Sequence, residues 1–493
     1  TGCFTDNQPD FSWLMPGEEK NFTQYFMPYK KIGVVKNANI HAALNMEFLD
    51  DQKVLLQLYA PEALHDCRLI LKNGNTTLLD QSIQLEPSQK MEKTLSIPAD
   101  VFPEQLYLSL LAADRKEILN VKPEAEKIEQ LPEAAKAIPD PQDVKTTEDL
   151  YLFGLHLEQY RHATFLPEAY YLEGLQRDSS DSRINNAYGS LLLRRGKFTE
   201  SEHYFRAAIR KLTRSNPNPY DGEPFFNLGY SLWLQGKIDE AYGAFYKSTW
   251  NSAWQNSGFY YLACIQTQKG NYQTALAHIE QSLIRNIHHM KARMLKTALL
   301  RETSQFEKAR CFAEESLEID PCDLGAMNEL RLLGDKESER VLLEQLQIQP
   351  NWTIELSLDY FTAGLYDQAV NILQTVIDLQ GTGPVYPMLY YHLGLNLIQK
   401  GDSDAAQASF VEATKACSNY CFPHRLEDIL ALQCALRYHA ADAKGWYYLG
   451  NLWYDKRQYD DAVSCWERSR ELDPSFPTVH RNLSLAYFNK KNR

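Results

Sequence analysis

The chain has 493 residues, of which 44% are hydrophobic and 23% are charged, and its formal net charge at pH 7 is −13. This length provides for roughly three domains with large cores, and the acidic balance disfavours a surface that follows nucleic-acid phosphates. No run approaches the roughly 18 apolar residues that a membrane span needs. We therefore expect a folded protein that binds neither nucleic acid nor membrane.

The first 36 residues carry three short motifs around a turn. They are Asn7-Gln8-Pro9-x-Phe11, Pro16-Gly17-Glu18 and Thr23-x-Tyr25-Phe26. Pro-Gly reverses the chain, and the aromatic run that follows predicts a strand. Together the motifs resemble the closing strands of the galactose mutarotase-like β-supersandwich. The resemblance implies that residues 1–36 end such a domain and that its sugar-binding body lies before Thr1.

The same resemblance raises the question of a catalytic carboxylate. In mutarotases a Glu shortly before the Asn-Gln-Pro segment is the general base, which must reach the anomeric hydroxyl of the sugar. Asp6, one place away from that position, and Asp10 are the catalytic candidates here; the alternative interpretation makes them turn residues beside Pro9. The sequence shows no Gly-rich phosphate loop and no nucleophile elbow. We expect these 493 residues alone to catalyse nothing and to hold no cofactor or metal.

Residues 37–121 change to an alternating pattern. The segment IHAALNMEF places Ile40, Ala42, Leu44, Met46 and Phe48 on one face, and about seven short strands separated by turn residues follow one another. This pattern predicts an immunoglobulin-like or fibronectin-like β-sandwich that serves as a spacer or packing partner. Residues 122–148, with four prolines and many charges, predict a linker.

Residues 149–493 form a repeat array. The segments that begin at Phe225, Phe259 and Arg293 align at a spacing of 34 residues, with Gly236, Gly270 and Ser304 at the same position. This period and these small residues resemble the tetratricopeptide repeat. We count about ten units and predict a mainly α protein in which a right-handed α-solenoid follows the β-sandwich. The whole layout resembles the C-terminal portion of bacterial tetratricopeptide-repeat proteins with an N-terminal mutarotase-like domain of unknown function.

Stacked helix pairs leave a concave groove lined by the first helix of each unit. The geometry of the repeat family implies that seven aromatic residues lie at or near groove positions: Phe226, Tyr230, Trp233, Tyr260, Tyr391, Tyr447 and Tyr454. We expect the groove to bind a protein or peptide, the chain's own upstream domain and a second copy included. The alternative is that these rings pack against a neighbouring turn of the superhelix. Lys444 and Asn451 resemble two sites that clamp a carboxylate in some repeat proteins, but the adjacent units supply no matching basic pair.

A second function class stays open, in which the chain is the C-terminal part of a carbohydrate-active enzyme whose catalytic domain lies before residue 1. Within this chain, Cys417, Cys421 and His424 lie close together and His288 adjoins His289, but no second ligand pair at a fitting spacing completes a zinc site. Nine cysteines show no disulfide framework. We expect buried, reduced thiols at four of them and therefore a cytoplasmic protein: Cys264, Cys311, Cys434 and Cys465.

Overall fold

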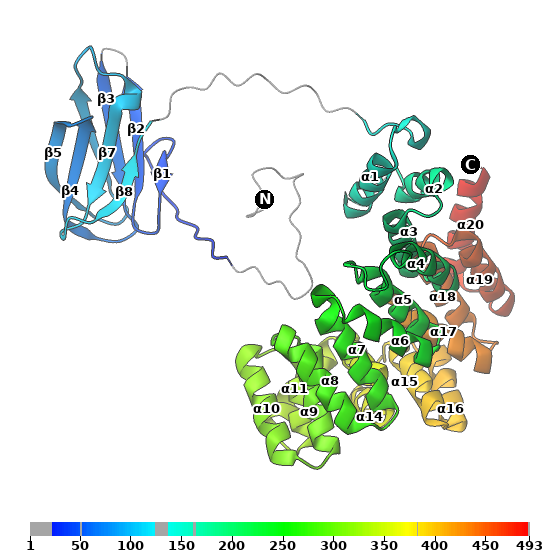
Figure 1. The fold of residues 1–493 in the computed structure, drawn as a ribbon. Helices are drawn as coiled ribbons and strands as arrows, with labels where there is room; N and C mark the ends of the chain where they lie inside the picture. The colour runs from blue at the N-terminus through cyan, green and yellow to red at the C-terminus, as the bar shows by residue number, and fades with distance from the viewer. Residues whose placement is uncertain (1–21, 50–51, 124–136, 161–163, 382, 492–493) are drawn as a thin grey trace. The chain divides into compact units, whose positions relative to one another are not determined.

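The computed structural model describes residues 22–49, 52–123, 137–160, 164–381 and 383–491 (Figure 1). These residues fall into two compact units, a β unit that ends at residue 123 and a helical unit that begins at residue 137. Eight strands and twenty α-helices make up the described part of the chain, so the protein is mainly α. None of the helices there has the length and apolar character needed to cross a membrane.

The β unit is a sandwich of two four-stranded antiparallel sheets. The strands are β1 Asn37–Ala38, β2 Ala43–Leu49, β3 Lys53–Tyr59, β4 Leu64–Asn73, β5 Thr76–Leu85, β6 Lys90–Ser96, β7 Leu106–Leu111 and β8 Glu117–Val121. One sheet has the order β1-β2-β3-β6 and the other β5-β4-β7-β8. With β2 as the first full strand, this is the order of an immunoglobulin-like sandwich, in which strands A, B and E face strands C, F and G.

The core of the sandwich comes from alternate residues of facing strands. Leu44 and Met46 of β2 are buried, with Leu56 of β3 in the same cluster. The expected alternation therefore holds in the middle of this strand. It fails at its ends, because Ile40 precedes β2 and is 48% exposed, and Phe48 near the end of β2 is 38% exposed.

Residues 22–36 contain no strand, so the strand predicted at Thr23-x-Tyr25-Phe26 is wrong. A strand requires a neighbour for its backbone hydrogen bonds, and in the described sheets β1 is the edge strand. Phe26 is 91% exposed, whereas Ile32 is fully buried beside Ala43 and Tyr59. The segment is thus attached to the sandwich through Ile32. The other two motifs of the opening stretch lie outside the described residues.

The helical unit is an array of antiparallel helix pairs. Its helices are α1 Thr147–Tyr160, α2 Pro167–Arg177, α3 Ser182–Arg194, α4 Phe198–Leu212, α5 Glu223–Leu234, α6 Ile238–Ser248, α7 Gln255–Gln268, α8 Tyr272–Arg285, α9 Met290–Glu302, α10 Phe306–Ile319, α11 Leu324–Leu332, α12 Lys336–Ile348, α13 Pro350–Thr362, α14 Tyr366–Leu379, α15 Pro387–Lys400, α16 Ser403–Lys415, α17 Leu426–Tyr438, α18 Ala443–Asp455, α19 Tyr459–Leu472 and α20 Pro477–Lys491. Sixteen of them, α1 to α16, follow one another as pairs, and α18 pairs with α19.

The repeat register appears in the helix boundaries. The helices α6, α8 and α10 begin at Ile238, Tyr272 and Phe306, at the 34-residue spacing that the sequence predicts. The turns before them need a left-handed backbone, which Gly236 provides with φ of 75°. Within a pair the backbones approach closely, because a Cβ at Gly229 of α5 would lie 2.7 Å from the ring of Phe245 on α6. The small residues that recur in the sequence repeat thus lie at the turns between helices and at close helix contacts.

Helix α17 departs from the pairing. It stands alone between the pair α15/α16 and the pair α18/α19, and it packs on α15. It belongs to none of the repeat copies that the sequence shows.

The array coils until its last helices contact its first ones. Lys197, at the start of α4, forms an ion pair with Asp461 of α19, with 3.0 Å between Nζ and Oδ2. A Cβ at Gly196 would meet Trp453 of α18 at 2.8 Å. Figure 1 shows α18 and α19 beside α3 and α4. Two turns of the superhelix are therefore in direct contact, and this contact creates the site described next.

Candidate functional site

Most of the seven aromatic residues predicted to line the groove pack against other residues of the helical unit. Trp233, Tyr260, Tyr391 and Tyr447 are buried, Phe226 and Tyr230 are half-buried, and Tyr454 is 37% exposed. Each ring lies against another ring of the helical unit. Their role in binding a partner stays a prediction, and the structure shows what most of them contact instead.

Five rings of α5, α6 and α7 form what we call the aromatic cluster: Phe226, Tyr230, Trp233, Phe245 and Tyr261. Tyr261 stacks on Phe245 with 4.7 Å between ring centroids, and lies 5.7 Å from Tyr230. Trp233 meets Phe361 of α13 edge to face at 6.2 Å. The cluster therefore bridges early and late helices of the array, as the alternative interpretation of the groove rings expects.

Tyr230 adds a polar link to this bridge. Its hydroxyl donates a hydrogen bond of 3.2 Å to Oε1 of Glu427 on α17, 197 positions later in the chain. Burial and the adjacent carboxylate raise the pKa of Tyr230, so the hydroxyl keeps its proton and remains a donor. The bond fixes α5 against α17.

Beside the aromatic cluster, two adjoining hollows form what we call the inter-turn groove. Each has a volume of about 660 Å³, and the two share part of their lining. The residues common to both are Phe198, Thr199, Gln235, Gln433 and Arg437. The start of α4 and the end of α5 thus form one wall, and α17 forms the other.

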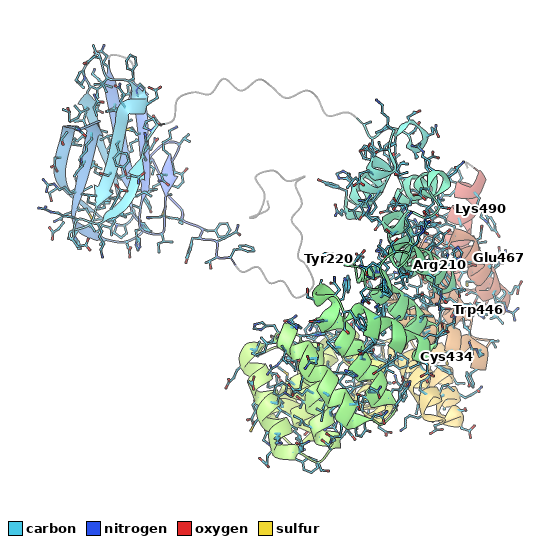
Figure 2. The ribbon with its side chains drawn as sticks, viewed as in Figure 1. Arg210, Tyr220, Cys434, Trp446, Glu467 and Lys490 are labelled. Carbon is cyan, nitrogen blue, oxygen red and sulfur yellow. The ribbon has the colours of Figure 1, made fainter. Side chains whose placement is uncertain are left out.

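The two hollows differ in their remaining walls. The first hollow continues along α13 and α15, with Phe361 and Ile398 among its apolar residues. The second continues along α18, with Trp446 and Trp453. Figure 2 labels Trp446 and Cys434, which line the groove from α18 and α17. Of the sequence-predicted residues, Trp233 lines the first hollow, while Tyr454 lines a separate one of about 560 Å³.

The polar side chains of α17 are free to bind a ligand. Gln433 and Arg437 lie one turn apart and are exposed. Within the part of the chain that the structure describes, neither makes a hydrogen bond or an ion pair. Trp446, in contrast, uses its indole N–H to donate to the carbonyl of Ala440 at 3.0 Å. The groove therefore combines apolar rings with unused donors and acceptors.

Two neighbouring residues of α15 hold the walls of the groove in position. His392 Nε2 lies 2.7 Å from Oδ1 of Asp428, whose Oδ2 accepts the backbone N–H groups of His424 and Arg425 at the start of α17. Burial by itself raises the pKa of Asp428, but His392 and Arg425 more than offset this and hold it at about 2. The capping carboxylate of α17 is thus anchored to α15.

The second anchor acts on α18. The hydroxyl of Tyr391 donates 2.6 Å to Oδ2 of Asp442, whose Oδ1 accepts the N–H of Gly445 and so caps α18. Tyr391 is therefore a buried support of α18 and not a wall of the groove.

Other candidates from the sequence have partners inside the chain. Lys444 donates to the carbonyl of Ala416 at 2.6 Å, and Asn451 Oδ1 accepts from Trp466 and Asn482. Both members of the expected clamp are thus engaged. Among the described residues, no three His, Cys, Asp or Glu side chains gather as a metal site, and Cys417 is exposed while Cys421 is buried.

One of the four thiols expected to be buried is not. Cys264, Cys434 and Cys465 are buried, but Cys311 is exposed, because it lies on the outer face of α10 between the buried residues Ala309 and Ala313. Asp6 and Asp10 lie outside the described residues.

The groove residues that sequence reasoning missed are Phe198, Phe361, Gln433, Arg437 and Trp446. They come from helices that are far apart in the chain, and α17 has no place in the repeat register. The signal that was available is local: Leu430, Gln433 and Arg437 form a stripe at helical spacing on one face of α17.

The fold and the repeats define a tetratricopeptide-repeat α-solenoid, a class whose general role is that of a protein-interaction scaffold. Family models for the tetratricopeptide repeat match residues 186–249, 389–420 and 443–476. A model described as "YphG-like protein, second domain" matches residues 37–120, the β-sandwich.

Solved structures of repeat proteins are similar at low identity. A tetratricopeptide repeat protein from Parabacteroides merdae is 15% identical, covers 62% of this chain and 98% of its own, and has a TM-score of 0.29. YrrB, described as a repeat protein with an unusual peptide-binding site, is 14% identical. The match covers 47% of this chain and 97% of YrrB, with a TM-score of 0.29. Human IFIT1, described as a dimer with m7Gppp-AAAA, is 17% identical. The match covers 66% of this chain and 72% of IFIT1, with a TM-score of 0.31. Such scores carry no argument about what this chain binds.

Proposed function

We propose that the helical unit is a scaffold that binds an extended peptide segment of a partner protein in the inter-turn groove. The observation that carries the proposal is the lining of this groove, which joins large rings to exposed polar side chains that have no partner among the described residues. Each hollow, at about 660 Å³, is of the size that ligand sites in proteins have.

The chemistry of the lining suits a peptide in two ways. Half-buried rings such as Trp446 and Phe361 offer apolar area with few rotatable bonds, which lowers the entropy lost on binding. An extended peptide also brings backbone N–H and C=O groups that must be hydrogen-bonded when they leave water. The amides of Gln399 and Gln433 are exposed in the groove and can both donate to and accept from such a backbone.

The test is selection of a displayed random-peptide library on the immobilised chain. The blocking variant is Gln433→Trp, because an indole at this exposed position fills the groove without removing a contact of the core. Gln374→Trp on the exposed side of α14 is the matched control. We expect the selected peptides to bind the control like the parent chain and the blocking variant at least tenfold more weakly. Equal binding to both variants would place the peptides elsewhere and overturn the proposal.

The identity of the partner is an outcome of further work on the selected sequences. A match to the chain's own N-terminal residues would indicate an intramolecular ligand, and a match to the helical unit would indicate a second copy. The carbohydrate-active alternative concerns a domain before Thr1, and nothing in the described contacts favours it. A mutarotation assay on the chain, with Asp6→Asn as its control, tests the separate expectation that these 493 residues alone catalyse nothing.

A further inference from the structure

One positive charge of the inter-turn groove has no ion-pair partner among the described residues. The guanidinium of Arg437 lines both hollows and is exposed. In the described part of the chain it forms no ion pair and no hydrogen bond. In the first hollow it is the single charged residue of the lining.

The other charges of the groove are confined to the second hollow. Lys197 and Asp461 neutralise each other across 3.0 Å where α4 meets α19. Glu200, in the first turn of α4, has no ion pair among the described residues either, but it lines the second hollow and not the first. The walls of the first hollow combine apolar residues such as Phe361 and Ile398 with uncharged polar ones such as Gln399. This hollow therefore presents one positive group in an otherwise uncharged lining.

We infer, on the basis of the proposed function, that the bound peptide carries an acidic side chain next to apolar residues, and that Arg437 binds its carboxylate. A planar guanidinium bonds a carboxylate through two parallel N–H groups, and such charge-assisted bonds are about twice as strong as neutral ones. The amide of Gln433, one turn before Arg437 on α17, is within reach of the same ligand. The apolar neighbours of the acidic residue would pack against the rings that line the first hollow.

The overall charge of the chain favours the opposite kind of peptide. A protein with a net charge of −13 attracts basic peptides through its long-range field. A preference for acidic peptides would therefore need a local cause, and Arg437 supplies it.

The experiment uses peptide pools that are degenerate at every position but the central one, which is fixed as Glu, Gln or Lys. Retention of each pool on the parent chain is compared with retention on Arg437→Ala and Arg437→Glu, and on Arg468→Glu of α19 as the control outside the groove. We expect the Glu pool to be retained about tenfold better than the Gln pool, as one charge-assisted bond implies. Arg437→Ala should remove this preference, Arg437→Glu should transfer it to the Lys pool, and the control should keep it.

The outcomes separate the two claims. If the pools bind and Gln433→Trp blocks them, but the central residue makes no difference, the groove binds peptides and the role of Arg437 is wrong. If the Lys pool is preferred on the parent chain, the inference is also wrong. If no pool binds, the proposed function itself fails. Circular dichroism of each variant confirms that it is folded, which we expect because Arg437 makes no contact that the fold needs.

Discussion

The aromatic cluster and the inter-turn groove lie side by side and share Trp233, yet they differ in what surrounds their rings. In the cluster every ring lies against another, Phe245 is fully buried, and the hydroxyl of Tyr230 is bonded to Glu427. In the groove Phe198, Phe361 and Trp446 are half-buried, and Gln433 and Arg437 beside them are exposed. The first region holds two turns of the array together, and the second is the space they leave.

This difference teaches that aromatic content alone does not mark a binding surface. Large rings are equally suited to a core and to an interface, because both exclude water from apolar area. The polar neighbours distinguish the two. A core leaves few polar groups without partners, whereas an interface keeps them exposed until the ligand arrives.

Truncation of the cluster should destabilise the helical unit strongly. Phe245→Ala removes a fully buried ring that packs on Tyr261 and on the backbone at Gly229, and we expect a loss of about 3–5 kcal/mol. Hydrogen exchange of α5 to α8 measures it, since a repeat array need not unfold in one step. Phe306→Ala, at a 53% exposed position, is the control and should change stability by less than about 0.5 kcal/mol. Similar small effects for both would mean that the cluster is not a core.

Acid should weaken the region next to the cluster. Burial, together with Lys291, lowers the pKa of His289 to about 4, and its Nδ1 lies 3.1 Å from Nδ2 of Asn256. The unfolded state takes up the proton first, at a pKa of about 6.5, so this stability is complete above pH 6.5 and is lost as the pH falls to 4. The ring is partly exposed, so we expect a loss of about 2 kcal/mol.

The measurement for His289 is the denaturation midpoint of the chain between pH 7 and pH 4. His289→Gln keeps a hydrogen-bonding group and removes the titration, so its curve should be flatter over this range. A parent and a variant with the same pH dependence would assign the effect to other groups.

Loss of the link between the turns should have the smallest effect. Tyr230→Phe removes the hydrogen bond to Glu427 and leaves the ring, and we expect a cost of about 1 kcal/mol. Tyr246→Phe, at a 48% exposed position, is the control. Binding of selected peptides should be little changed by either. A large loss of binding in Tyr230→Phe alone would join the cluster and the groove into one functional unit.

Much of the fold is readable from the sequence, and the reason is local. The 34-residue period predicts the ends of α5, α7 and α9 and the starts of α6, α8 and α10, because the turns between them depend on neighbouring residues such as Gly236. The other boundaries of these helices depart from the period by one to three residues. The alternation around Leu44 and Met46 predicts β2 for the same reason. The strand expected at Thr23-x-Tyr25-Phe26 is absent, since a strand also depends on a partner that local pattern cannot supply.

The candidate site is readable only in part. Trp233 is the one predicted residue that lines the inter-turn groove. The place of Tyr391 in the repeat predicts a groove position, but its hydroxyl donates to Asp442, the residue whose carboxylate caps α18. Arg437 lies on α17, outside the repeat register, and the stripe that it forms with Leu430 and Gln433 does not tell which helices face it.

The repeat period, the helix pairs and the two-sheet module before them follow from periodicity and turn residues over short distances, so they can be read from the amino-acid sequence. Which rings become core and which line a groove is a choice made by the packing of the whole helical unit. That choice depends on the coiling of the array, which brings Lys197 to Asp461 across 264 positions and Tyr230 to Glu427 across 197. Small rotations at each helix pair add up to this contact, and no single segment encodes their sum.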